Sequence, residues 1–449
     1  MQRIRKVKSP FKAGMYLLET LTSGMYNEPL SIYREYIQNA VDSIDVLTSI
    51  KKKLAIKVDI NIDPFKKTIT ISDNGFGVPS DIAEKTLSSI GSSDKAHSGL
   101  RGFRGIGRLG GIAFSDKAVY RTKAQGEKTE SIQEWDCKKL REILADPQKS
   151  SLSIKQLFNQ TTTFYQQNSR QPSGSYFEVV LEGVSSFRNH VIDIRKVRDY
   201  VSQVTPVPFH PEFSYSNKIN DFFNKHLSHY GKYEIFLNGE SVYKPYQNKV
   251  KITKKGYDDV IDVETFKIKI KEKIAAVGWY GIRRDLLGAI AKGNGDSGIR
   301  VRVGNILIGD AHLLDNCFRE PRFNSYIIGE VHVDSPDLIP NSRRDDFVDN
   351  EIKTLFYNAI ERKIGLPVSK EIRLRSRLNS EGTNIKLDSE KKLFEENYER
   401  AKIVNKIKNQ KLFDNISNDF QAKKLLEKMI TICQNCECFN KLLKQFKVN

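Results

Sequence analysis

The sequence predicts a mixed α+β protein with more than one domain, and three observations support this. The chain has 449 residues, of which 39% are hydrophobic, so it is long enough for two or three domains with their own cores. Ser31–Asp45 carries apolar residues at helical spacing, whereas Ile69–Asp73 and Ile299–Leu307 alternate as strands do. Helix-like and strand-like segments follow one another along the chain, which is typical of mixed folds.

The first informative element is the predicted helix Ser31–Asp45, with the sequence SIYREYIQNAVDSID. Its polar residues Glu35, Asn39 and Asp42 share one face at i, i+4 and i+7, and apolar residues pack the other side. An acid on such a face can orient and deprotonate a water, and an amide oxygen is a hard ligand for Mg²⁺. The alternative interpretation is a solvated polar stripe on a surface helix.

The next element is a predicted strand, Ile69–Pro79, which breaks at Asp73 into a glycine-containing turn. Gly75 and Gly77 allow the backbone to turn tightly against a bound ring. A carboxylate at this strand end can accept a hydrogen bond from an exocyclic amine and so select adenine. An ordinary Asx turn at a strand end is the alternative.

A second glycine-rich segment, Gly99–Gly111, contains Gly102, Gly105 and Gly107 in a G-x-x-G-x-G array. Backbone N–H groups of such a loop, leading into a helix, form a cradle for anions. The segment lacks the G-K-[ST] of a Walker loop, and no repeated βαβ pattern surrounds it.

In this order, E-x-x-x-N-x-x-D, D-x-G-x-G and G-x-x-G-x-G resemble the nucleotide site of the GHKL ATPase superfamily. Its members include gyrase-type topoisomerases, histidine kinases, MutL and MORC proteins and the ninety-kilodalton heat-shock chaperones. The chaperones are the most similar, since Phe11–Asp45 resembles their entry helix and first ATP-site helix, and Leu87–Ile90 resembles the opening of their ATP lid. The resemblance implies a two-layer α/β sandwich of the Bergerat type that binds ATP and Mg²⁺.

The resemblance extends over Gly298–Phe347, which is similar to the chaperone middle domain. Within it, Val333–Asp345 resembles the V-D-S-x-D-L segment and the loop bearing a catalytic arginine. Aligned without gaps, Arg344 stands at the arginine that reaches the γ-phosphate, and a shift of one residue gives Arg343 instead. A guanidinium is always charged and matches phosphate oxygens bidentately.

The resemblance also implies a role for each site residue. Glu35 activates the water, Asn39 holds Mg²⁺, and Asp42 supports the adenine end of the helix or the loop glycines. Lys95, in the polar lid segment, is free to approach phosphate. Ser175 stands where the chaperones have a threonine whose hydroxyl helps to bind the adenine-contacting water.

The domain boundaries are expected at 1–187 for the ATP-binding domain, 188–366 for an α/β middle or transducer domain, and 367–449 for a basic helical C-terminal region. The last core strand of the first domain is predicted at Ser175–Leu181, and middle-domain strands at Tyr233–Leu237, Ala275–Tyr280 and Ile299–Leu307.

Residues Ala124–Pro172 form a longer insert than the family needs. Its segment Ser131–Pro147 has a helical pattern ending at proline, and Gln160–Ser175 is predicted to be a polar loop. This insert is a candidate contact surface.

The formal charge of +18, from 73 Lys+Arg against 55 Asp+Glu, favours polyanionic partners such as nucleic acid. A lysine-rich solubilising surface explains it equally, and no recognised DNA-reading motif is present. No run of about 18 apolar residues occurs and the basic N-terminus lacks an apolar segment, so a cytoplasmic protein is expected. Among five cysteines, Cys433, Cys436 and Cys438 are either free thiols or three ligands of a zinc site.

Two functional hypotheses follow. The first is an ATP-hydrolysing conformational switch that acts on protein clients, as the chaperones do; the second is an ATP-gated nucleic-acid clamp of MORC or MutL type in bacterial defence or repair. A scaffold with vestigial hydrolysis is a third option that Glu35 argues against. No phosphoacceptor helix or tyrosine-bearing cleavage domain is evident, which argues against a histidine kinase or topoisomerase. The basic tail replaces the chaperone dimerisation domain, so any homodimer is expected to depend on ATP.

Overall fold

The computed structural model describes residues 14–20, 28–50, 56–91, 107–169, 171, 173–184, 190–253, 256–291 and 297–380. The chain divides into two compact units, Met1–Arg375 and Ser376–Asn449. The fold below is that of the first unit. The predicted C-terminal helices beyond residue 380, and with them the cysteine cluster, lie outside the described residues.

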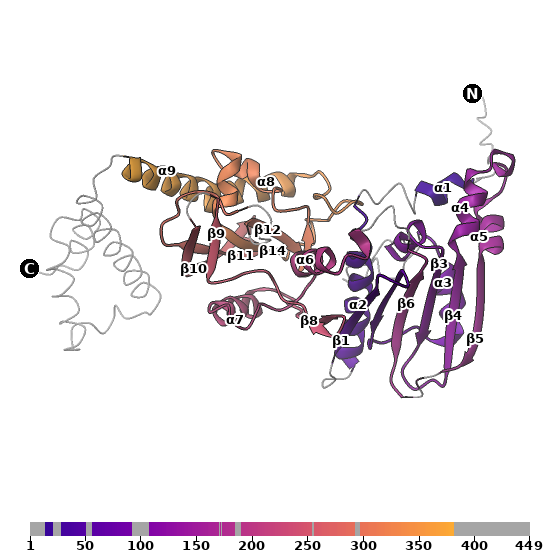
Figure 1. Cartoon of the computed structure of the whole chain (residues 1–449). Helices are drawn as coiled ribbons and strands as arrows, with labels where there is room; N and C mark the ends of the chain where they lie inside the picture. Colours follow the sequence, from indigo (N-terminus) through magenta and orange to yellow (C-terminus); the bar gives the residue numbers. More distant parts are fainter. Residues whose placement is uncertain are drawn as a thin grey trace, which may run out of the picture. The chain divides into compact units, whose positions relative to one another are not determined.

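The first unit is built on two sheets (Figure 1). The eight-stranded sheet has the order β5-β4-β3-β6-β2-β1-β7-β8. Its strands are β1 Lys57–Asp63, β2 Thr68–Asp73, β3 Lys117–Lys123, β4 Thr129–Asp136, β5 Thr162–Asn168, β6 Tyr176–Glu182, β7 Glu234–Leu237 and β8 Glu240–Ser241. The helices associated with this part of the chain are α1 Tyr16–Glu19, α2 Ser31–Ile50, α3 Ser80–Ser88, α4 Cys137–Ala145, α5 Ile154–Thr161 and α6 Ile194–Val204, with short turns η3 Gly107–Ala113 and η4 Pro147–Lys149.

Alternation of side chains fixes how β1 and β2 sit in this sheet. The two strands pair antiparallel with Val58 opposite Asp73, and every second residue of each is buried. Because side chains alternate between faces, Asp73 shares the buried face of β2 with Ile69 and Ile71. The predicted strand Ser175–Leu181 is β6, which lies inside the sheet between β2 and β3. The strand that ends at Asp73 therefore occupies the middle of the sheet, beside α2.

The strand expected at Tyr233–Leu237 forms, as β7, but it does not join the middle-domain sheet. β7 pairs parallel to β1, with Ile235 opposite Val58, and so extends the first sheet. Tyr233 and Ile235 are buried in the same core as α2. The sequence pattern of an apolar strand does not say which of two neighbouring sheets it completes, and this assignment was wrong.

The insert differs from its prediction in both halves. Ser131–Asp136 belongs to β4, and only Cys137–Ala145 is helical, because the Asp136 side chain accepts a hydrogen bond from Lys139 N and begins α4 there. The predicted polar loop contains the edge strand β5, which pairs with β4. Paired Thr, Phe and Tyr residues have high β-propensity, which outweighed the polar composition.

The second sheet has six strands in the order β13-β12-β14-β11-β10-β9. They are β9 Lys249–Ile252, β10 Gly256–Ile270, β11 Lys273–Arg283, β12 Gly298–Val303, β13 Ile306–Ile308 and β14 Ile328–Val333. The expected single strand Ile299–Leu307 is a hairpin, because Gly304 and Asn305 have φ of 56° and 63° and turn the chain between β12 and β13.

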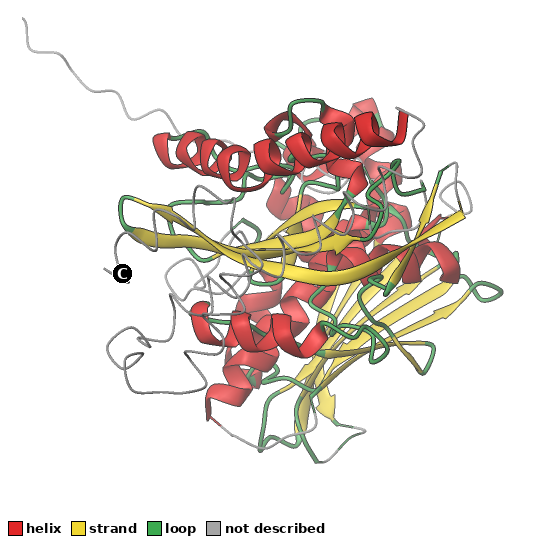
Figure 2. Ribbon diagram, turned by 90° about the vertical axis from the view of Figure 1, so that its left-hand side faces the viewer, coloured by secondary structure: helices red, strands yellow, loops and turns green. Residues whose placement is uncertain are grey.

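Helices cover both faces of the second sheet (Figure 2). α7 Ser216–His226 packs Phe223 into an aromatic core with Phe209 and Trp279. α8 Glu351–Ile360 and α9 Leu366–Ser380, joined by η8 Glu361–Gly365, pack on a separate core; η6 Asp315–Cys317 and η7 Pro321–Tyr326 are short turns. None of the helices in the described ranges combines the length and apolarity needed to cross a bilayer.

Candidate functional site

The three predicted polar residues of α2 do not form a solvated stripe. Asp42 is fully buried, Asn39 is half-buried, and the side chain of Glu35 is only 14% exposed. The apolar face of the helix, including Ile37, Val41 and Ile44, packs on the core of the first sheet. Because buried polar groups are costly without partners, polar residues at such positions are characteristic of a site.

Two guanidinium groups face one oxygen of Glu35. Arg34 Nε donates to Glu35 Oε1 at 3.2 Å, and Arg344 Nε lies 3.9 Å from the same atom. The Arg344 side chain is 12% exposed, whereas Arg343 is exposed. Of the two candidate arginines, Arg344 is therefore the one that the fold brings to α2.

The other oxygen of Glu35 faces the backbone of η3. A Cβ atom on Gly107 would lie 2.4 Å from Glu35 Oε2, so any larger residue here would displace the carboxylate from its present position. Gly107 is the one residue of the predicted glycine array within the described ranges, since Gly102, Gly105 and Lys95 lie outside them.

Two tyrosine hydroxyls hold η3, one from α2 and one from β3. Tyr36 accepts from Gly111 N at 2.9 Å and donates to the Arg108 carbonyl at 3.0 Å, while Tyr120 donates to the same carbonyl at 2.6 Å. The Arg108 guanidinium in turn binds the Ser89 carbonyl, and burial lowers the pKa of this arginine. These bonds tie together the residues that precede and follow the predicted lid.

The turn after β2 is fixed by its own carboxylate and by α2. Asp73 Oδ1 accepts from Gly75 N at 2.8 Å, and Phe76 N donates to the Ser43 carbonyl at 3.1 Å. Gly77 has φ of +71°, and a Cβ there would lie 2.1 Å from the Lys123 carbonyl oxygen. The turn is thus an Asx turn in form, built so closely against α2 and β3 that glycine is required.

Ser175 joins this turn from the start of β6. Its Oγ donates to the Gly75 carbonyl at 2.5 Å, and both Ser175 and Asp73 are buried, each 6% exposed. The structure therefore brings together Asp73, Gly75 and Ser175 at one end of α2, and Glu35 and Gly107 further along it.

The loop that carries Arg344 is held in an uncommon conformation. Arg344 has φ of +58°, which is sterically costly for a residue with a Cβ. Its carbonyl accepts from Gly309 N at 2.7 Å and its N–H donates to the Asn341 carbonyl at 3.2 Å. Gly309 itself has φ of +64°, and a Cβ there would lie 2.9 Å from the Asp345 carbonyl oxygen. The hydrogen bond between Gly309 and Arg344 joins these two turns and so fixes the backbone from which the guanidinium extends.

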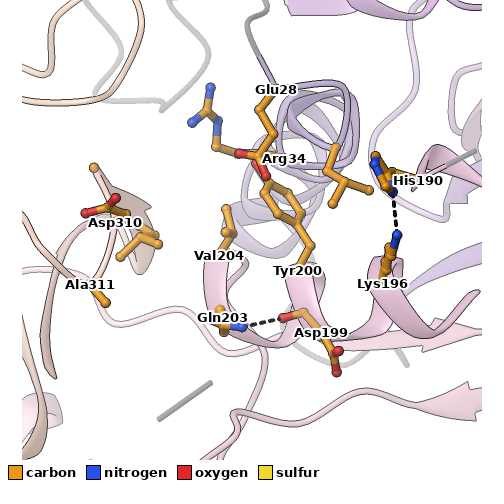
Figure 3. Close-up of a pocket in the computed structure, with 13 residues that line it drawn as sticks. Glu28, Arg34, His190, Lys196, Asp199, Tyr200, Gln203, Val204, Asp310 and Ala311 are labelled. Carbon is orange, nitrogen blue, oxygen red and sulfur yellow. Dashed lines mark hydrogen bonds between the residues drawn. The ribbon is translucent and has the colours of Figure 1, made fainter. Parts of the chain in front are cut away.

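A cavity of about 480 Å³ is lined in part by Arg34, the residue that pairs with Glu35 (Figure 3). Glu28 and Arg34 line it from the α2 side, Tyr200 from α6, and Asp310 from the segment after β13. Burial raises the pKa of Glu28, with Asp310 adding to the effect and Arg34 opposing it. Burial also raises the pKa of Tyr200, whose hydroxyl feels the charges of Arg34, Glu28 and Glu35.

Three residues of this region were not singled out from the sequence. Arg34 directly precedes the candidate base, so its position was a usable signal. Tyr36 stands at an apolar packing position of the helical pattern, which gives no sign that its hydroxyl makes the hydrogen bonds to η3. Tyr200 gave no signal, because nothing in its helix pattern shows which neighbour it meets.

The residues present fit ATP with Mg²⁺. A buried carboxylate at Asp73, a glycine at Gly107 that lets the backbone lie close to Glu35, and the amide of Asn39 between two acids form the set of groups such a ligand needs. Among the described residues there is no group of three or more His, Cys, Asp and Glu that would hold a metal ion.

Comparison with known proteins agrees with this geometry. Residues 31–164, from α2 to within β5, match the family model described as "Histidine kinase-, DNA gyrase B-, and HSP90-like ATPase". The chain is also similar to the chaperone protein HtpG of Escherichia coli strain K12 and of Shigella dysenteriae serotype 1 (strain Sd197), with 32% identity over 142 residues in each case. The match covers 27% of this chain and 22% of the relatives, so the chain spans about a fifth of their length. Residues 31–164 are therefore similar to the ATPase domains of histidine kinases, DNA gyrase B and HSP90-like proteins, which make up the GHKL superfamily.

Proposed function

We propose that this protein is a Mg²⁺-dependent ATPase that uses hydrolysis to drive a conformational cycle acting on protein clients. The observation that supports it most directly is the approach of Arg344, from the segment after β14, to Glu35 on α2. A base and a phosphate-matching cation meet only when these two parts of the chain are together. The proposed division is an ATP-binding domain at 1–187, a middle domain at 188–366 and a basic helical region at 367–449. Strand β7, from the proposed middle domain, pairs with β1 of the ATP-binding domain.

Each site residue has a proposed task. Asp73 accepts from the adenine amine, and Ser175 fixes the turn carbonyl beside it. Asn39 would hold Mg²⁺, which neutralises phosphate charge when bound. Asp42, fully buried, supports the adenine end of α2 or the loop glycines, and the backbone of Gly107 lets the phosphate chain approach Glu35.

Glu35 is the proposed general base, and its arginines set when it acts. With Arg34 donating to Oε1 and Arg344 facing it, this oxygen is engaged by cations. Phosphate oxygens are stronger partners for a guanidinium than one shared carboxylate oxygen. A γ-phosphate would therefore draw Arg344 from Glu35, freeing the carboxylate to orient a water while Arg344 stabilises the transferred charge.

Hydrolysis by the wild type and by Glu35→Gln tests this proposal. Glutamine keeps the size of the side chain but cannot take a proton, so we expect loss of hydrolysis with retained binding of a fluorescent ATP analogue. Equal rates in both proteins would refute the assignment of the base. Sedimentation with and without a non-hydrolysable ATP analogue would show whether two copies pair in the ATP state.

A second candidate is an ATP-gated nucleic-acid clamp, favoured by the charge of +18 and by one local cluster. His226, at the end of α7, has its pKa lowered by partial burial and by the nearby charges of Lys267 and Lys225. Such uncompensated cations suit a phosphate backbone. Stimulation of hydrolysis by double-stranded DNA, abolished by salt and by Lys225→Glu with Lys267→Glu, would favour the clamp; a rate indifferent to DNA would leave the client-directed switch.

A further inference from the structure

Helix α6 has one face in the core beside α2. Val197 and Val201 are fully buried in the core that also contains the apolar residues of α2. On a neighbouring face, Tyr200 extends toward Arg34 and Glu28 in the cavity beside the site (Figure 3). A shift of α6 along its axis would therefore move one wall of the cavity that Arg34 also lines.

The C-terminal end of α6 is bound by arginines from the second sheet. Arg302, on β12, donates through Nη2 to the Gln203 carbonyl at 2.6 Å and through Nη1 to the Thr205 carbonyl at 3.4 Å. Arg300, on the same strand, donates to Gln203 Oε1 at 3.1 Å. Cations at this end also complement the helix dipole.

Arg302 belongs to a buried charge cluster that gives it little freedom. Its Nε donates to Glu330 Oε1 at 2.6 Å, and Lys244 Nζ donates to the same oxygen at 2.8 Å. His332 Nε2 lies 3.0 Å from the other oxygen, and the side chains of Arg302, Lys244 and Glu330 are 0% exposed. A buried network in which each charged group has hydrogen-bond partners has one favoured arrangement. Because Arg302 belongs to it, the bonds from Arg302 hold the end of α6 in a fixed position on the second sheet.

The far side of the same cavity leads to the arginine loop. Gly309 and Asp310 line the cavity opposite Tyr200, and Gly309 N binds the Arg344 carbonyl. Helix α6 therefore packs against α2, which carries Glu35, and against β13, which leads to Gly309, and its C-terminal end is bound by Arg302 of β12.

We propose that α6 couples the two halves of the hydrolytic site, with Tyr200 and Arg302 as positioning residues for the Glu35–Arg344 pair. Tyr200 fixes the position of Arg34 and Glu35 relative to α6. Arg302 fixes the position of α6 relative to the second sheet, which leads into the loop of Arg344. Neither residue touches the nucleotide. The inference rests on the ATPase function proposed above.

Conservative substitutions test this without emptying the core. Tyr200→Phe removes only the hydroxyl, and Arg302→Lys keeps the charge beside Glu330 while losing the fork that reaches two carbonyls. We expect each to lower kcat about fivefold to twentyfold while KM and the affinity for a fluorescent ATP analogue stay within twofold of wild type. Tyr165→Phe on the exposed edge strand β5 and Arg195→Lys, exposed on α6 itself, are the matched controls and should leave kcat unchanged.

The double variant distinguishes coupling from two separate defects. If both residues act through α6, Tyr200→Phe should have little further effect in an Arg302→Lys background, whereas independent defects multiply. Should Arg302→Lys fail to fold in thermal unfolding, Gln203→Leu, which removes the half-buried acceptor of Arg300, replaces it in the cycle.

Wild-type kcat in both single variants, or multiplicative effects in the double variant, would overturn the inference. A change in KM alone would also overturn it, since it would place Tyr200 in nucleotide binding. These results differ from failure of the proposed function, in which wild-type protein itself shows no hydrolysis that depends on Glu35.

Discussion

The guanidinium of Arg344 lies 3.9 Å from the carboxylate of Glu35, with both side chains largely shielded from water. Glu35 sits on a helix of the first sheet, and Arg344 on a loop packed against the turn that follows the second sheet's β13. Because Arg34 binds the same oxygen of Glu35, this carboxylate is shared between its own helix and a distant loop. The position of this one carboxylate oxygen therefore depends on both α2 and the Arg344 loop.

Single alanine substitutions should distinguish the role of Arg344 from that of its neighbour Arg343. Arg344→Ala removes the cation that faces Glu35, so we expect steady-state ATP hydrolysis to fall about a hundredfold or more. Arg343 is exposed, and Arg343→Ala should leave the rate within twofold. The opposite order of effects would assign the phosphate-sensing role to Arg343.

Gly107 should be needed for the rate more than for stability. In Gly107→Ala the new methyl group would lie 2.4 Å from Glu35 Oε2 and would displace the carboxylate. We expect kcat to fall at least about tenfold, since small misplacements of a catalytic group are costly. Gly14→Ala, where a Cβ meets nothing within 4 Å, is the control. A normal rate in Gly107→Ala would mean that Glu35 acts from another position.

Asp73 should select adenine. In Asp73→Asn, one oxygen remains to accept from Gly75 N, but an amide NH₂ replaces the carboxylate acceptor. Affinity for ATP, measured by calorimetry, should fall about tenfold or more, and discrimination against GTP should shrink with it. Asp63→Asn makes the same change in the exposed turn between β1 and β2, where Asp63 Oδ1 accepts from Phe65 N and Lys66 N, and should not alter binding.

The buried His332 should make stability depend on pH. Burial lowers the pKa of His332 to about 4, despite its contact with Glu330 Oε2. An unfolded histidine titrates near about 6.5, so between about pH 6.5 and 4 the unfolded chain binds a proton that the folded chain does not, and acid destabilises the fold. We expect the free energy of unfolding to fall by about 2 kcal/mol between pH 7 and pH 5 from this group.

Chemical denaturation at the two pH values measures this change. The surrounding groups are Glu330, Lys244 and Arg302 together with the rings of Phe223 and Tyr230. His332→Gln should flatten the dependence, whereas His312→Gln, at an exposed position, should not. An unchanged slope in His332→Gln would place the titrating group elsewhere in the cluster.

The α2 site was predictable because its chemistry is local. Glu35, Asn39 and Asp42 follow from helical spacing alone, and Asp73 follows from the alternation that ends at a turn. The ungapped alignment favours Arg344 over Arg343, but the contact of Arg344 with α2 could not be predicted, because it depends on the φ of +58° and on the hydrogen bond with Gly309. Such a conformation is set by packing between segments distant in sequence.

The errors in the predicted fold have the same origin. The six residues Ser131–Asp136 read as helix but pair with β3, and the polar segment from Gln160 contains a strand because β4 offers it a partner. Strand partners are chosen by neighbours in space, which no window of sequence contains. For the same reason β7 was assigned to the wrong sheet.

The pairing of β7 with β1 has a consequence for folding of the chain during its synthesis. Until Glu234–Leu237 leave the ribosome, β1 presents an open row of backbone donors and acceptors on its outer side. A nascent fragment that ends near residue 187, the boundary proposed for the ATP-binding domain, would thus have an unpaired strand edge that can pair with other chains. A fragment that ends after β8, at Ser241 or beyond, should therefore aggregate less than a fragment that ends near residue 187.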